Sequence, residues 1–454
     1  MPVEKNKEYI VDIIDNGFEG EGIAKIEGYT IFIPNAIKGE RIKILIVKVL
    51  KSHAFGKIVE IISPSKNRIK EDCTTYKRCG GCDLRHIEYK ETLKMKQNAV
   101  QSLVNKTLKN TIQVQETLGM KNPLYYRNKA QYPVGIDKNG NATIGVFANR
   151  THEIIPIETC LIQNKTSQEL AKFIINFINE NKISIYNEHK QKGLIRHIVT
   201  KVGMRTGEVM CILVINGKNI PKEKELVHTI INNFPQVKTI VKNINMKNTN
   251  VILGNKNINL YGDGYITDVL GEYTFKISPH SFYQVNPIQA EKLYKIGVEA
   301  ANITNNDIVF DLYCGIGTIS LFMAQYAKKV YGIEIVEEAI KDAKENAKLN
   351  NIKNAEFIAG DVEKILDKLI NKDKIIPDIV MIDPPRKGMD TQSVENILKI
   401  EPKKLVYISC NPATLIRDLQ KLEEKYEIKM IKPVDMFPFS KHIECIAVLE
   451  LLKI

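Results

Sequence analysis

The sequence lacks any long apolar run, and this absence excludes several classes of protein. No stretch is apolar enough to span a bilayer, and the opening residues, Met-Pro-Val-Glu-Lys-Asn-Lys-Glu, hold no apolar segment of a signal peptide. Eight cysteines in 454 residues are too few for a disulfide scaffold, and no internal repeat is visible. We therefore expect a cytoplasmic protein with no membrane partner. Its composition, 44% hydrophobic and 26% charged, is typical of a soluble globular chain.

Positive charge is concentrated in the first third of the chain. The formal net charge is +12, and residues 1–150 hold 25 Lys and Arg against 16 Asp and Glu. A local positive excess is what a polyanion-binding region requires, because neutralising phosphates releases their condensed counterions. A solubilising surface accounts for the charge equally well, so the excess alone leaves nucleic-acid binding open.

The first part of the chain has the pattern of a small all-β domain. Residues 8–62 read as short strands between glycine turns, which is typical of an OB-like β-barrel. A helix is predicted at residues 90–108, whereas residues 115–265 mix strands and helices without a clean period, so no topology follows there. The predicted strands of the barrel are Tyr9–Ile14, Gly22–Ile26, Thr30–Ile33, Glu40–Val49 and Gly56–Ile62.

Strands and helices alternate from residue 290 onward, which predicts a parallel, doubly wound sheet. At this length two or three domains are expected. The predicted fold class is multidomain α/β: an OB-like barrel over residues 1–62, a mixed α+β central domain over 63–265, and a doubly wound Rossmann-like domain over 266–454. The predicted strands of the last domain are Ile308–Leu312, Val330–Ile333, Glu356–Ala359, Ile379–Ile382 and Lys404–Ile408.

A glycine loop follows the first of these strands. Glycines at such a turn let a ligand approach the backbone closely at the carboxyl edge of the sheet. The third glycine of the dinucleotide fingerprint is absent, since Ser320 stands in its place, which argues against NAD. The loop residues are Tyr313, Cys314, Gly315, Ile316, Gly317 and Thr318.

Two carboxylates follow the next strands and narrow the choice of ligand. Glu334 closes the second strand, where a carboxylate can accept hydrogen bonds from a ribose diol, and Asp361 ends the third, where it can meet an adenine edge. This succession resembles the class I S-adenosylmethionine methyltransferases. The resemblance implies S-adenosylmethionine as cofactor, while a Rossmann turn with a phosphate-bearing ligand also fits these residues.

Cys410 follows the fifth strand, and Asp383-Pro-Pro-Arg386 follows the fourth. The two prolines make a stiff corner, which in many methyltransferases lies beside the transferred methyl group and elsewhere is only a structural turn. Free cysteine is usually a small buried hydrophobe, so its place at a strand tip is what distinguishes Cys410. Carbon 5 of uracil needs such a residue, because it accepts a methyl group only after a thiolate has added to carbon 6.

A base must then remove the hydrogen left on carbon 5. Glu444, which ends the run Met436-Phe-Pro-Phe-Ser-Lys-His-Ile-Glu444, precedes the last apolar strand and is the candidate. A partly desolvated carboxylate suits the step, since desolvation raises its pKa towards neutrality. Taken alone, a glutamate here is more often a solvated strand-end charge.

Together these motifs resemble the RNA uracil-5-methyltransferase family, over essentially the whole chain. Further matches are Ser278-Pro-His-Ser-Phe-Tyr-Gln284-Val-Asn286 and Tyr126-Arg-Asn-Lys129, and the barrel resembles a TRAM domain, an RNA-binding module. Ser440 stands where the family commonly has threonine. The resemblance implies Cys410 as nucleophile and Glu444 as base. It places S-adenosylmethionine against Gln284, Tyr313, Glu334 and Asp383. The glycine loop and the third strand end add four further candidate contacts, Gly315, Gly317, Thr318 and Asp361.

Two rival functions remain to be weighed. Cytosine-5 methyltransferases place a cysteine after a proline in the fourth-strand motif, whereas here Asp383-Pro-Pro-Arg-Lys-Gly388 has none, which favours uracil. A non-catalytic RNA-binding assembly factor would not need Cys410, Glu444 and the glycine loop together, so their presence argues for an enzyme.

Four cysteines form a further candidate site. Cys73, Cys79 and Cys82 lie close in sequence, with two glycines between the last pair that allow a tight wrap, and Cys160 follows far downstream. The spacing fits zinc and an iron–sulfur cluster equally well. The ribosomal branch of the family carries a [4Fe-4S] cluster at the corresponding cysteines, and this resemblance favours the cluster. Arg85 stands where the family usually has glutamine.

The predicted partner is RNA. The cysteines favour 23S ribosomal RNA over transfer RNA through resemblance alone, and a monomer is expected. The target uridine must leave its stack to reach Cys410. Tyr125, Tyr126 and Arg127 are candidate RNA contacts, although a Tyr-Tyr pair is more often core.

Overall fold

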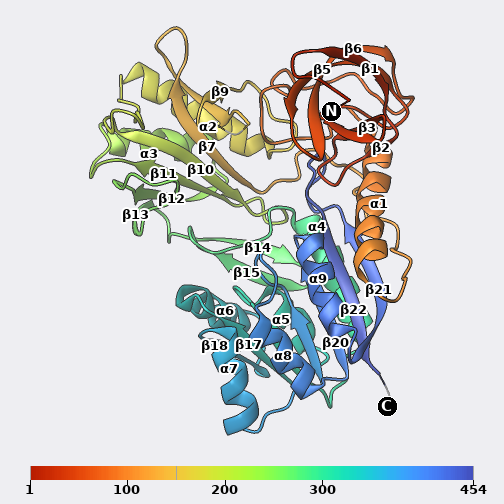
Figure 1. The fold of residues 1–454 in the computed structure, drawn as a ribbon. Helices are drawn as coiled ribbons and strands as arrows, with labels where there is room; N and C mark the ends of the chain where they lie inside the picture. The colour runs from red at the N-terminus through yellow and green to blue at the C-terminus, as the bar shows by residue number, and fades with distance from the viewer. Residues whose placement is uncertain (1, 150, 453–454) are drawn as a thin grey trace.

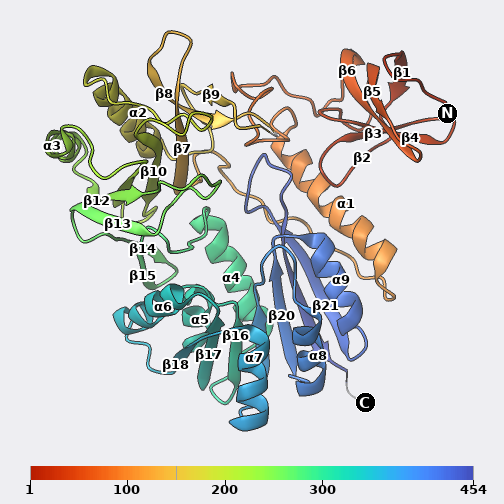
Figure 2. The same ribbon diagram turned by 60° about the vertical axis from the view of Figure 1, so that its left-hand side comes forward.

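The computed structural model describes residues 2–149 and 151–452, and within them it forms three larger β-sheets (Figure 1). The amino-terminal barrel and the central sheet lie side by side at one end of the molecule, and the carboxyl-terminal sheet lies at the other (Figure 2). Over the same described residues, no helix is long and apolar enough to cross a membrane.

The amino-terminal barrel follows from the alternation of apolar and polar residues along its strands. Ile31, Ile33, Ile42 and Ile44 are buried, whereas the residues between them are more exposed. The strand order is β1-β5-β6-β4-β3-β2. The five predicted strands match β1, β3, β4, β5 and β6 within a few residues, whereas the two-residue β2 was not predicted. The strands are β1 (Glu8–Asp12), β2 (Asp15–Asn16), β3 (Gly22–Ile26), β4 (Tyr29–Ile33), β5 (Arg41–Val49) and β6 (His53–Ser63).

The central sheet has the strand order β13-β12-β11-β10-β7-β8-β9, which the sequence did not predict. Every residue of β10 and β11 is buried, so neither strand shows the alternation that reveals a half-exposed strand. Two helices, α2 (Lys165–Glu180) and α3 (Glu223–Asn233), pack on the sheet. The strands are β7 (Lys129–Ile136), β8 (Ala142–Phe147), β9 (Ile154–Pro156), β10 (Ile195–Val202), β11 (Val209–Ile215), β12 (Val237–Ile244) and β13 (Lys256–Tyr261).

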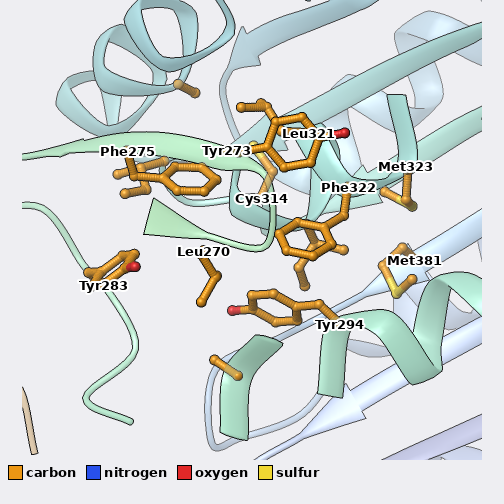
Figure 3. Close-up of a cluster of buried hydrophobic side chains, with 14 of the residues drawn as sticks. Leu270, Tyr273, Phe275, Tyr283, Tyr294, Cys314, Leu321, Phe322, Met323 and Met381 are labelled. Atoms are coloured by element: carbon orange, nitrogen blue, oxygen red, sulfur yellow. The ribbon is translucent and has the colours of Figure 1, made fainter. Parts of the chain in front are cut away.

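A hairpin connects the central sheet to the carboxyl-terminal one. Its strands, β14 (Ile266–Leu270) and β15 (Tyr273–Ile277), pack against the helices of the last sheet. The rings of Tyr273 and Tyr294 lie 5.4 and 5.8 Å from that of Phe322, and Cys314 belongs to the same buried cluster (Figure 3). Cys314 is therefore a core residue.

The carboxyl-terminal sheet has the order β18-β17-β16-β19-β20-β22-β21. The five predicted strands pair in parallel, as expected of a doubly wound sheet, whereas β22 runs antiparallel to both of its neighbours. The strands are β16 (Ile308–Leu312), β17 (Lys329–Glu334), β18 (Ala355–Ala359), β19 (Ile379–Ile382), β20 (Lys404–Ser409), β21 (Tyr426–Val434) and β22 (Glu444–Leu451). The helices are α4 (Pro287–Ala301), α5 (Thr318–Ala324), α6 (Glu337–Leu349), α7 (Val362–Asp367), the π-helical turn η1 (Lys368–Lys372), α8 (Thr391–Ile400) and α9 (Pro412–Leu422).

Helix α1 (Tyr89–Thr107) packs on this last sheet, although it comes early in the chain. It lies against α9 and β21 (Figure 1), where Val100 and Val104 share a buried cluster with Leu419. The chain before residue 108 therefore helps to build the surroundings of the carboxyl-terminal sheet. The domain limits at 62 and 265 stay predictions.

Candidate active site

Three reactive side chains meet at one edge of the carboxyl-terminal sheet. Asp383 follows β19 and Cys410 follows β20, and these two parallel strands are paired. Beside β20, the antiparallel β22 pairs Cys445 with Ser409, so its first residue, Glu444, lies next to Cys410. The structure therefore brings the predicted nucleophile, the predicted base and the Asp383 corner together.

Burial dominates the electrostatics of the two carboxyl groups. Glu444 is 3% exposed, and burial, followed by repulsion from Asp383, raises its pKa well above the ordinary range, with Arg386 opposing the shift. Burial and the nearby Asp311 raise the pKa of Asp383 to about 7. The site thus holds acidic groups that a cation would stabilise in their ionised form.

The Cys410 thiol is half-buried beside these acids rather than packed in hydrocarbon. Burial and then the charges of Glu444 and Asp383 raise its pKa to about 11, and Arg386 opposes them. Cys410 also comes two residues before α9, where the amino-terminal helix dipole favours a thiolate. Asn411 caps this helix through Ala413 N and donates to the carbonyl of Arg386, 3.1 Å away, which ties Arg386 to the start of the helix.

The glycine loop has the backbone that its sequence requires. Gly315 and Gly317 have φ angles of 53° and 80°, a region that favours glycine. A Cβ on Gly315 would meet nothing within 4 Å, so open space lies over the loop. Glu334 accepts hydrogen bonds from Gly315 N at 3.3 Å and Val336 N at 2.9 Å, which fixes its carboxylate at the loop.

The other predicted cofactor contacts lie at the same sheet edge. Gln284 and Thr318 lie beside the buried Tyr294, which also senses the charges of Asp383 and Glu444. Tyr313 has a φ of 67° at the start of the glycine loop, and Asp361, which follows β18, is exposed at the start of α7. Their roles stay predictions.

Asp311 is a buried acid near Asp383 for which the sequence analysis made no prediction. It is fully buried in β16, accepts a hydrogen bond from Ser320 through Oδ2, and leaves Oδ1 without a partner. Burial raises its pKa to about 7. Its position two residues before Tyr313 was the available signal, because an acid at a strand end faces the same edge as the glycines. The unpaired Oδ1 of Asp311, the acids Asp383 and Glu444, and the open space over Gly315 together fit a cationic nucleoside ligand.

The four predicted metal cysteines line one cavity of about 60 Å³. Cys79 is held to the central sheet by a bridge to Ala148, and Cys160 N donates to Gln168 Oε1 of α2 at 2.6 Å. Arg85 also lines the cavity, and its Nη1 is buried without a partner. Among residues 2–149 and 151–452, no three His, Cys, Asp or Glu side chains lie close enough to hold one metal ion.

One of the three candidate RNA contacts is buried, whereas the other two are partly exposed. Tyr126 is 2% exposed and donates to Pro438 O at 3.2 Å, so its prediction as an RNA contact is wrong: it is a core residue. Arg127 is partly buried near Cys160, and its Nε lacks a partner. Tyr125 is likewise partly exposed, with Lys165 Nζ 4.7 Å from its ring centroid.

The outer face of the barrel carries an aromatic cluster. Phe32, His53 and Phe55 lie on β4 and β6, with ring centroids 5.2 to 6.0 Å apart. Exposed Lys48 pairs with Phe55 in the sheet register, and exposed Lys57 follows on β6. Aromatic rings beside lysines are typical of surfaces that bind single-stranded nucleic acid, because bases stack on the rings and phosphates pair with the cations.

Comparison with known proteins agrees with this geometry. Residues 88–452 match the family described as tRNA (Uracil-5-)-methyltransferase, and residues 2–59 match the TRAM domain. The chain is 47% identical over 454 residues to an uncharacterized RNA methyltransferase of Clostridium acetobutylicum, covering 99% of this chain and 98% of that protein. It is 45% identical over 452 residues to another of Halalkalibacterium halodurans, covering 99% and 98%.

A solved structure is similar over nearly the full length. It is the crystal structure of Pyrococcus abyssi tRNA (uracil-54, C5)-methyltransferase in complex with S-adenosyl-L-homocysteine. The TM-score is 0.78 at 27% sequence identity, and the match covers 97% of this chain and 99% of that one. The resemblance expected from the motifs is thereby confirmed, since the family match spans most of the chain. The protein belongs to the tRNA (uracil-5-)-methyltransferase family and is an S-adenosylmethionine-dependent RNA uracil-C5 methyltransferase with a TRAM domain.

Proposed function

We propose that this enzyme methylates carbon 5 of a uridine in 23S ribosomal RNA, with Cys410 as the nucleophile and Glu444 as the base. The observation that carries the proposal is the pairing of β20 with β22, which sets these two residues side by side. The barrel and the central domain, residues 1–62 and 63–265, would bind the RNA. The carboxyl-terminal domain, residues 266–454, would bind the methyl donor.

The first step is addition of Cys410 to the uracil ring. Burial and the neighbouring acids keep the thiol protonated in the free enzyme. Its proton must therefore leave before the addition, and it passes to water on the exposed side of the residue. Sγ then bonds to carbon 6, and the electron pair of the C5–C6 double bond moves onto carbon 5 and the O4 carbonyl. Arg386 and the amino terminus of α9 favour the thiolate that this step needs.

S-adenosylmethionine, held at the glycine loop beside Glu334 and Asp383, would supply the methyl group to carbon 5 and would leave as the neutral thioether. Glu444 then removes the remaining proton from carbon 5, the double bond re-forms, and Sγ departs with its electron pair. Burial and the neighbouring Asp383 raise the pKa of Glu444. A carboxylate with a raised pKa is suited to accept the proton from carbon 5.

We further propose a [4Fe-4S] cluster on Cys73, Cys79, Cys82 and Cys160. All four cysteines line one cavity of about 60 Å³, and a set of four thiolates suits an iron–sulfur cluster; the preference for a cluster over zinc depends on the resemblance to the ribosomal branch of the family. The unpaired Nη1 of Arg85 is suited to offset the negative charge of such a cluster. The methyl transfer itself requires no redox change, so the role of the cluster would be structural.

Transfer RNA is the second candidate substrate. The Pyrococcus abyssi relative acts on uracil 54 of transfer RNA, and it aligns with nearly the whole of this chain. The proposal of 23S ribosomal RNA depends instead on the resemblance of the four cysteines to those of the ribosomal branch. Mapping 5-methyluridine in both RNAs from cells lacking the protein separates the two.

The mechanism is tested with two variants and labelled methyl donor. Cys410→Ala should bind S-adenosylmethionine with unchanged affinity and transfer no methyl group, because no adduct can form. Glu444→Gln should transfer one methyl group per enzyme and then retain the RNA as a covalent adduct that survives denaturing electrophoresis. Methylation by Cys410→Ala would show that the nucleophile is wrongly assigned, and full turnover by Glu444→Gln would do the same for the base.

A further inference from the structure

Glu444 is preceded by a loop, residues 435–443, that joins β21 to β22. The loop is not supported by the carboxyl-terminal sheet alone. Most of its outside partners come from residues 83–126, a segment that begins next to Cys82 and belongs to the early part of the chain.

Asp83 makes the most direct connection. Its side-chain Oδ2 accepts a hydrogen bond from Lys441 N at 3.0 Å. In the other direction, the backbone N–H groups of Asp83 and Leu84 both donate to Phe439 O at 2.9 Å. The loop is thus clamped on both sides of Ser440, within five residues of Glu444.

Phe439 packs the loop against residues that line the cysteine cavity. Its φ of 65° turns the side chain into a buried cluster with Tyr126, against which Cys82 and Cys160 pack. The guanidinium of Arg85 lies 4.4 Å from the centroid of the same ring. Cys82 and Cys160, two of the four cysteines that line the cavity, therefore pack against the cluster that holds the loop.

A buried ion pair fixes the other end of the loop. Lys96 Nζ lies 2.6 Å from Asp435 Oδ1 and donates to His442 O at 2.9 Å, and both charged side chains are buried. Tyr89 donates to Asp435 Oδ2 at 2.7 Å. The loop that leads to the base consequently has a defined position before RNA binds.

We infer that the cysteine-bearing segment positions Glu444, and that Asp83 is the positioning residue that joins Cys82 to the loop at Lys441. The inference rests on the proposed role of Glu444 as base. The four cysteines that line the cavity thereby have a function in turnover that requires no electron transfer. Correct folding around them keeps Asp83 in place, and Asp83 keeps the base within reach of carbon 5.

The inference is tested on the full-length protein with Asp83→Ala, which removes the acceptor for Lys441 N. Methyl transfer in a single turnover should stay within about twofold of the parent, whereas release of methylated RNA should slow by about tenfold or more, because small displacements of a catalytic group are costly. Covalent adduct should therefore accumulate. Asp83→Asn keeps an oxygen that can accept from Lys441 N and should restore release.

Two further measurements separate positioning from loss of structure. Hydrogen exchange of the amides in residues 435–443, measured without RNA, should rise in Asp83→Ala and not in Asp83→Asn. The matched control is Glu19→Ala, which removes an exposed ion pair to Nζ of the same Lys441, 2.9 Å away, and should behave as the parent.

Glu444→Gln serves as the reference in this experiment. If it traps adduct while Asp83→Ala releases product at the parental rate, the positioning inference is wrong and the proposed function stands. Equal losses of methyl transfer and release in Asp83→Ala, without rescue by Asp83→Asn, would also overturn the inference. If Glu444→Gln traps no adduct, the proposed base itself is wrong.

Discussion

S-adenosylmethionine and S-adenosylhomocysteine differ by one methyl group and one positive charge, and the buried acids at the sheet edge predict that pH separates their affinities. Asp383 has a pKa raised to about 7 by burial and by Asp311, whose own pKa is raised to about 7. Below that pH, Asp383 and Asp311 are largely protonated in the free site. A bound sulfonium would favour their ionised forms instead. Binding of the cation therefore releases protons, whereas binding of the neutral thioether does not.

The size of the effect follows from proton linkage. If one proton is released, the dissociation constant for S-adenosylmethionine should fall about tenfold for each pH unit between about pH 5 and 7, or roughly 1.4 kcal/mol per unit. The constant for S-adenosylhomocysteine should change little over the same range. The ratio of the two constants cancels every other titrating group that both ligands meet equally.

Isothermal titration calorimetry in two buffers with different protonation enthalpies counts the released protons directly. The matched variant is Asp383→Asn, which removes one titrating group while keeping the shape of the corner, and it should flatten the pH dependence for the cationic ligand. Equal pH dependence for the two ligands would refute the reasoning, since the acids would then not sense the sulfonium.

Two further predictions concern regions remote from the sheet edge. Phe55→Ala should weaken binding of single-stranded RNA by about 1–3 kcal/mol in fluorescence anisotropy, the usual worth of one stacked base, whereas Val59→Ala on the same strand should not; equal affinities would contradict the stacking surface. Protein purified without oxygen should be brown and contain about four irons, Cys160→Ser should lose them, and Cys211→Ala should keep them, because Cys211 is buried and does not line the cavity. Colourless protein holding one zinc would contradict the proposed cluster.

The part of the site formed by parallel strands was predictable from sequence. Apolar runs ending in Asp383 and Cys410 place both residues at the same sheet edge, because the carboxyl ends of parallel strands coincide. Glu444 was harder, since it begins a strand and reaches this edge only because β22 is antiparallel. Nothing in its local sequence distinguishes a buried base from a solvated charge, so its assignment depended on the family resemblance.

The central sheet shows why other features escaped prediction. All residues of β10 are buried, including Arg196 and Lys201, so polar residues occur where a core strand would be expected to have none. Lys201 Nζ donates to the carbonyls of Ser278 and Ser281, at 2.7 and 2.9 Å, groups that lie far away in sequence. Hydrophobic periodicity cannot register partners supplied by tertiary structure.

The reversed direction of β22 also affects how the enzyme is made. During synthesis the strands β16 to β19, with the glycine loop and Asp383, leave the ribosome before Glu444 does. The residues proposed to bind the methyl donor, and Cys410, are therefore made before the residue proposed to free the RNA. Turnover through the proposed base accordingly requires the final strand, which pairs with β20.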